Sequence, residues 1–116
     1  MSLTSIVSIR ITVFVILLGL SPLARAETVF VKYRGMVNLA PFQCETVTRS
    51  RFIHRVCYDK RERYMLISLN GVYYHYCEIG AQTISSLMKA DSMGRYYNAF
   101  IKGNYDCRIN RMPSYK

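Results

Sequence analysis

The stretch Leu69-Asn70-Gly71-Val72-Tyr73-Tyr74-His75-Tyr76-Cys77 predicts a tight hairpin turn that leads into an aromatic strand. Asn-Gly is a strong hairpin signal, because both central residues of a type I′ turn need a positive φ. This turn sets the register, so three cross-strand pairs share one face of the sheet: Leu69 with Val72, Ile67 with Tyr74, and Met65 with Tyr76. Side chains alternate along a strand, so Tyr73, His75 and Cys77 are predicted on the other face.

Apolar runs upstream of this hairpin predict further strands. Phe52–Tyr58 is expected to pair with Tyr64–Leu69 across a charged turn. Thr28–Val31 and Met36–Leu39 predict one or two edge strands, or a hairpin around Gly35. Ala40–Cys44 is expected to bend or lie at an edge because of its proline.

Two short helices are predicted downstream of the hairpin. Apolar residues at helical spacing predict a helix over Gln82–Ala90, and Ser92 is expected to cap a second segment from about Arg95 to Lys102. Gly103 is expected to end it. We therefore predict an α+β fold: a small antiparallel sheet, made of a three-strand meander plus an N-terminal edge strand or strands, covered by two short helices.

The first 26 residues have the three-part pattern of a secretory signal peptide. A weakly basic lead, Met1–Arg10, precedes the apolar run Ile11–Leu20, and Ala24-Arg25-Ala26 is the cleavage motif. A membrane anchor is the alternative, but ten apolar residues are too few, because a spanning helix needs about 20. We expect cleavage after Ala26, no transmembrane anchor after cleavage, and a periplasmic or secreted mature chain.

The mature chain, residues 27–116, holds all four cysteines: Cys44, Cys57, Cys77 and Cys107. An even number of cysteines in a small exported domain predicts two disulfides. A zinc site is the alternative, but the chain has no C-x-x-C pair and its two histidines lie alone on strand-like runs. We expect no metal and no cofactor.

The charge of the mature chain limits its partners. Removing Arg10 and Arg25 from the 16 Lys and Arg leaves 14 against 7 Asp and Glu, a net charge of +7. This charge favours lipopolysaccharide, acidic lipid, a cell-wall polymer or nucleic acid as partner. The alternative is that the charge only keeps the protein soluble, since the basic residues are spread along the chain.

Two groups of residues together resemble the KTSC domain, which occurs at the C-terminus of some lysyl-tRNA synthetases and as a stand-alone bacterial protein. The first group is Ser50, Ile53, Tyr58-Asp59, Asn70-Gly71, Tyr74 and Tyr76. The second is Ala90, Ser92, Gly94, Tyr96-Tyr97-Asn98, Ile101-Lys102 and Tyr105. The resemblance implies a unit of three strands and two helices, with a proposed RNA-binding role.

The chain departs from the family pattern in its signal peptide, its four cysteines and Gly80, where the family usually has proline. We divide it into a signal peptide (1–26), an N-terminal extension with edge strands (27–49), a KTSC-like domain (50–107) and a tail (108–116). An exported, oxidised domain does not meet tRNA, so nucleic acid is not the expected partner.

Four cysteines allow three pairings, and the sequence does not choose among them. We favour Cys44–Cys107, because these residues flank the KTSC-like domain, together with Cys57–Cys77 at one end of the meander. Against the second pair, strands one and three of a meander lie about 9.6 Å apart, twice the strand spacing. A disulfide needs Cα atoms within about 7 Å.

The candidate binding surface combines tyrosines with basic residues. Tyr74 and Tyr76 are expected in the core, so the surface is assigned to Tyr73, His75, Arg95, Tyr96 and Lys102. Tyrosine offers a flat apolar contact with a polar tip, and arginine offers planar donors to phosphate or carboxylate. If the second helical segment covers that face, these tyrosines belong to the core instead.

Catalysis is not expected. Cys57 or Cys77 with His75 and Asp91 has the composition of a Cys-His-Asp set, but disulfide pairing removes the nucleophile. The chain has no Gly-rich phosphate loop and no paired-carboxylate signature. We predict a non-enzymatic exported binding module for an anionic envelope component. The alternatives are an accessory or structural envelope protein that acts only by protein contact, and a nucleic-acid-binding domain by family analogy.

Overall fold

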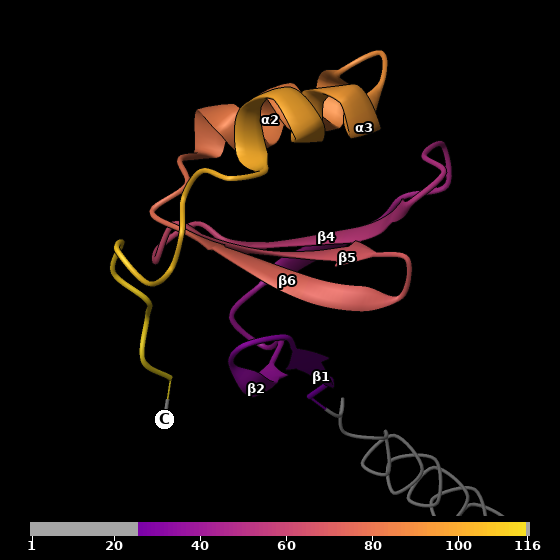
Figure 1. The fold of residues 1–116 in the computed structure, drawn as a ribbon. Helices are drawn as coiled ribbons and strands as arrows, with labels where there is room; N and C mark the ends of the chain where they lie inside the picture. The colour runs from indigo at the N-terminus through magenta and orange to yellow at the C-terminus, as the bar shows by residue number, and fades with distance from the viewer. Residues whose placement is uncertain (1–25, 116) are drawn as a thin grey trace, which may run out of the picture.

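The structure is a computed structural model that describes residues 26–115 (Figure 1). Apart from Ala26, the predicted signal peptide lies outside the described residues. The elements in chain order are β1 (Thr28–Val31), β2 (Gly35–Asn38), β3 (Gln43–Thr46), β4 (Ile53–Asp59), β5 (Tyr64–Leu69), β6 (Val72–Cys77), α2 (Ala81–Lys89), α3 (Met93–Tyr96) and the π-helical turn η1 (Tyr97–Ile101). Among the residues described, no helix is long and apolar enough to span a bilayer.

The β5–β6 hairpin forms as its sequence predicts. Asn70 and Gly71 have φ values of 51° and 84°, the left-handed conformations that a two-residue turn requires. The register pairs Leu69 with Val72, Ile67 with Tyr74, and Met65 with Tyr76, which confirms the predicted pairs.

The remainder of the sheet is larger than predicted. Six strands in residues 26–115 form one mixed sheet in the order β2-β1-β6-β5-β4-β3. The predicted antiparallel meander is correct for β4, β5 and β6, but β3 extends it by a fourth strand and β1 runs parallel to β6. The sequence signal for β3 was weak because this strand is short and mostly exposed, without a run of apolar residues.

The molecule has a helical layer on one face of the meander and the β1–β2 hairpin on the other (Figure 1). The core on the helical side is built from β4, β5 and the three helical segments: Val47, Ile53, Val56, Met65, Ile67, Ile79, Leu87, Met93, Tyr97 and Ile101. The opposite core joins the N-terminal segment to the meander: Val31, Val37, Leu39, Phe42, Cys57, Tyr64, Leu66 and Cys77. The outer sheet face, which was predicted to be free, is therefore covered.

The disulfides link Cys44 to Cys57 and Cys77 to Cys107, so the pairing that we favoured from the sequence is wrong. Strand β3 places Cys44 directly opposite Cys57, with their Cα atoms 3.9 Å apart. Cys57 and Cys77 lie on strands separated by β5, where Leu66 is the partner of Cys57. The intervening strand keeps these two cysteines apart.

The two helices match their predicted positions within two residues. The Ser92 hydroxyl accepts a hydrogen bond from the Arg95 backbone N–H, as expected for an N-cap. Gly103, with a φ of 84°, follows η1 at the predicted end of the segment. Gly94 lies against Phe52: a Cβ at position 94 would be 2.6 Å from Cε1 of that ring.

We expect Gly94→Ala to lower the free energy of unfolding by about 1–2 kcal/mol, because overpacking outweighs a helix-propensity gain of up to about 1 kcal/mol. The Phe52 ring packs edge-on against buried Tyr97, so its displacement disturbs the core on the helical side. Urea denaturation measures the change. Gly80→Ala is the matched control, since a Cβ there meets nothing within 4 Å. Equal stability of the two variants would contradict the packing argument.

Candidate functional site

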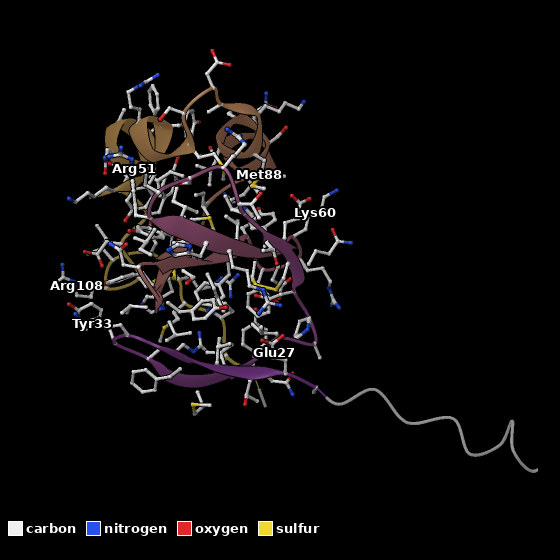
Figure 2. All side chains as sticks on the ribbon, turned by 90° about the vertical axis from the view of Figure 1, so that its right-hand side faces the viewer. Glu27, Tyr33, Arg51, Lys60, Met88 and Arg108 are labelled. Carbon is white, nitrogen blue, oxygen red and sulfur yellow. A yellow bond between two sulfur atoms is a disulfide. The ribbon has the colours of Figure 1, made fainter. Side chains whose placement is uncertain are left out.

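A cleft of about 510 Å³ lies at the edge of β6, within the size range of ligand pockets. The turn of the β1–β2 hairpin lies on one side of it and the segment after η1 on the other. Figure 2 shows Tyr33 and Arg108 on the same side of the molecule, away from Lys60. The residues that line the cleft are Tyr33, Tyr74, His75, Tyr76, Gly103, Asn104, Asp106, Cys107 and Arg108.

Tyr33 forms one wall of the cleft on an unusual backbone. Its φ is 72°, in the left-handed region that few residues other than glycine adopt. Its side chain is 80% exposed, so burial in the core does not explain a tyrosine here. The Lys32 ammonium lies 5.4 Å from the Tyr33 ring centre and 5.6 Å from the Tyr74 ring centre, which places a cation beside this wall.

The opposite wall is fastened to the end of β6. Cys107 is bonded to Cys77, and the Cys77 backbone N–H donates to the Tyr105 carbonyl at 2.8 Å. Asp106 accepts three hydrogen bonds from the Arg108 guanidinium, two from Nε at 3.1 Å and one from Nη2 at 2.7 Å. These bonds, with one from the Arg108 backbone N–H, lower the pKa of Asp106 to about 2. The Asp106 charge is therefore largely neutralised by its neighbour.

His75 lies in the floor of the cleft, and a hydrogen bond to a buried tyrosine fixes its imidazole. Its Nδ1 is 2.8 Å from the hydroxyl of fully buried Tyr64. Burial lowers the pKa of His75 below its ordinary value of 6.5, and the nearby Arg34 guanidinium lowers it further. The imidazole is therefore neutral at pH 7, and when the Tyr64 O–H donates to Nδ1, Nε2 carries the proton.

We expect the folded protein to lose stability as the pH falls below about 6.5, the pKa of an unfolded histidine. In that range the unfolded chain takes up a proton at position 75 before the folded chain does, so stability rises with pH. Chemical denaturation at pH 7, 6 and 5 measures the slope. His75→Gln should flatten it, and an unchanged slope would show that His75 is not responsible.

The structure separates the residues that the sequence grouped as a binding surface. His75 lines the cleft, but Tyr73 packs in the core beneath the hairpin, with its hydroxyl 3.3 Å from Arg55. Arg95, Tyr96 and Lys102 belong to the helical layer on the opposite face of the sheet. The predicted five-residue surface is therefore wrong, because the sheet lies between its two halves.

Sequence reasoning missed most of the cleft wall. Tyr33 and Asn104 gave no motif, and Tyr74 and Tyr76 were assigned to the core, where they also pack. A correct prediction of the Cys77–Cys107 pair would have indicated that Asp106 and Arg108 lie beside β6.

Most of the family-pattern residues have structural roles. The Tyr58 hydroxyl donates to the Ile79 carbonyl at 2.7 Å, and Asp59 accepts from the backbone N–H groups of Arg61 and Glu62. The hydroxyls of Tyr76 and Tyr97 bond to each other and tie β6 to the helical layer. Gly71 serves the turn, Ala90 ends α2, Ser92 caps α3, and Ile101 is fully buried. Asn98 and Lys102 are exposed, and no contact explains them.

The described residues suggest neither a thiol nor a metal centre. All four cysteines are bonded in disulfides, which includes the two considered with His75 as a catalytic set. Within residues 26–115, no three His, Cys, Asp or Glu side chains gather as metal ligands. The cleft instead offers aromatic rings and an imidazole, with the Lys32 ammonium beside it, and these groups suit the binding of a polar ligand.

Comparison with known proteins identifies the central part of the chain. The KTSC domain family matches residues 49–105. The crystal structure of a KTSC domain protein from Yersinia pestis is similar with a TM-score of 0.52 and 27% sequence identity, over 56% of this chain and 92% of that one. No curated protein matches the chain. The resemblance inferred from the sequence is thus confirmed, and residues 49–105 belong to the KTSC domain family.

Proposed function

We propose that this protein is an exported, non-enzymatic binding module that holds an anionic component of the cell envelope in the cleft beside β6. The observation that supports this most is the cleft itself, which exposed Tyr33 and the imidazole of His75 line, with the Lys32 ammonium beside the Tyr33 ring. Asp106 and Arg108 are paired with each other and together add no net charge, so the Lys32 ammonium is the charge that favours an anion beside the cleft.

The cleft is lined partly by the family match and partly by segments outside it. Residues 49–105 supply the edge of β6 and the Gly103–Asn104 turn, whereas Tyr33, Asp106, Cys107 and Arg108 come from segments before and after that match. The binding role is therefore proposed for this chain and not for KTSC domains in general. Nucleic acid is a less suitable partner, because we also propose that the chain is cleaved after Ala26 and acts in the periplasm or outside the cell.

Removing the cation beside Tyr33 is expected to weaken binding. The test uses protein recovered from the periplasm, with a mature N-terminus at Glu27 checked by intact mass. Three probes are measured by interferometry at low and high salt: lipopolysaccharide micelles, phosphatidylglycerol vesicles and poly-glutamate. We expect binding to at least one probe that weakens with salt, and Lys32→Ala should lower its affinity about tenfold, as for a residue central to a binding site.

Control variants show which part of the molecule is responsible for binding. Lys60→Ala removes the same charge from an exposed position away from the cleft, as Figure 2 shows, and should change affinity little. Arg95→Ala with Lys102→Ala removes two charges from the helical layer. A larger loss for that double variant would move the site to the helical layer. Absence of binding to all three probes at low salt would favour an accessory protein whose charge only promotes solubility.

A further inference from the structure

The edge of β6 is only partly covered by the rest of the chain. Strand β1 pairs with β6 at one position, Val31 with Tyr73, and the Lys32 N–H donates to the Tyr73 carbonyl at 2.9 Å. At the other end, the Cys77 N–H donates to the Tyr105 carbonyl at 2.8 Å. His75 lies between these two contacts, in the floor of the cleft.

The backbone of His75 points into the cleft. In an antiparallel pair, alternate residues direct both their N–H and C=O groups toward the neighbouring strand or away from it. Tyr73 and Cys77 direct theirs away from β5, so His75, two residues from each, does the same. Within residues 26–115, neither backbone group of His75 forms a hydrogen bond outside the sheet ladder. One donor and one acceptor at the same residue are therefore available to a ligand.

This spacing suits one kind of partner. In an antiparallel pair, a single residue of an extended polypeptide supplies both an acceptor and a donor to the residue opposite it, and a peptide can add to a sheet edge in this way. The gap from Tyr73 to Cys77 is four residue steps, or about 13 Å, and because both end positions are already bonded it admits at most three extended residues. The Tyr33 and Tyr74 rings flank the gap, and Lys32 forms no salt bridge to any residue that the structure describes.

We propose that the occupant of the cleft is an extended, acidic polypeptide segment of another exported protein, which pairs with the backbone of His75 as a short added strand. This inference rests on the proposed binding function and names its ligand class. The Lys32 ammonium receives an acidic side chain of the segment, and the Tyr33 ring covers the added strand.

The probe is a phage-displayed library of random linear dodecapeptides, panned against the oxidised protein from the periplasm. We expect selected peptides to contain Asp or Glu. Synthetic copies should lose affinity about tenfold toward Tyr33→Ala, and retain it toward Ile109→Ala. Ile109 is the matched control because it is 84% exposed, compared with 80% for Tyr33, and does not line the cleft. N-methylation at one particular residue of the peptide should abolish binding, because it removes the donated N–H.

Amide hydrogen exchange gives the direct readout. With peptide at ten times its Kd, exchange of the His75 amide should slow about tenfold. Peptide binding without this protection, or equal binding to both variants, would overturn the inference while the binding function stands. Binding of lipopolysaccharide or vesicles, when no peptide is selected, would also overturn the inference while the binding function stands. If neither peptides nor the other anionic probes bind, the proposed function fails together with the inference.

Discussion

Replacing Cys77 and Cys107 together by alanine is expected to lower the free energy of unfolding by about 4 kcal/mol, from the entropy of closing a loop of this length. The two cysteines are 30 residues apart in sequence, and Cys77 is fully buried. Loss of the bond also frees the segment that carries Asp106 and Arg108, so binding in the cleft should fall with stability. Urea denaturation followed by circular dichroism measures the first effect, and interferometry with the best-binding probe measures the second.

The second disulfide supplies the control. Cys44 and Cys57 are 13 residues apart, so their double replacement should cost less, about 3 kcal/mol. This bond joins β3 to β4 and does not include a residue that lines the cleft. Its loss should therefore leave binding nearly intact under conditions where the protein stays folded. Equal loss of binding in both double variants would show that the Cys77–Cys107 bond has no special role at the cleft.

The central hairpin is well predicted because the residues that determine its turn and register are close together in the sequence. Asn70 and Gly71 supply the left-handed conformations of the turn, and that turn fixes the pairing of every residue from Leu69 back to Met65. The helical segment after Ser92 is local in the same way, since its cap and its terminal glycine lie within a few residues of it. Each of these elements carries its own signal and needs no distant partner.

The missed features depend on distant contacts. Strand β3 exists because β4 offers it an edge, and its own residues are mostly exposed and polar. The parallel contact of β1 with β6 rests on one residue pair, for which no sequence pattern exists. The Cys44–Cys57 bond follows from the pairing of β3 with β4, so the missed strand led to an incorrect pairing. Of the predicted binding surface, only His75 lies in the cleft, because the coverage of the outer sheet face was not foreseen.

Strand β5 lies between two packed layers, the helices on one face and the β1–β2 hairpin on the other. Two neighbouring residues on β5 test whether these layers are separate. Leu66 and Ile67 are both fully buried, but Leu66 faces the β1–β2 hairpin and Ile67 faces the helices. Leu66→Ala and Ile67→Ala are each expected to lower the free energy of unfolding by about 2–5 kcal/mol, through lost burial and a residual cavity. The two cavities lie on opposite faces of the same strand.

The two substitutions differ in which elements lose protection from hydrogen exchange. Hydrogen exchange should rise in β1 and β2 for Leu66→Ala, and in α2 and α3 for Ile67→Ala, because local opening follows the layer whose packing is lost. Leu66→Ala should also weaken binding in the cleft, since the hairpin that carries Tyr33 packs against this face. Ile67→Ala should retain binding while the protein stays folded. The same exchange pattern in both variants would mean that the sheet and its two layers open as one unit, and that the hairpin is not a separable addition to the KTSC domain.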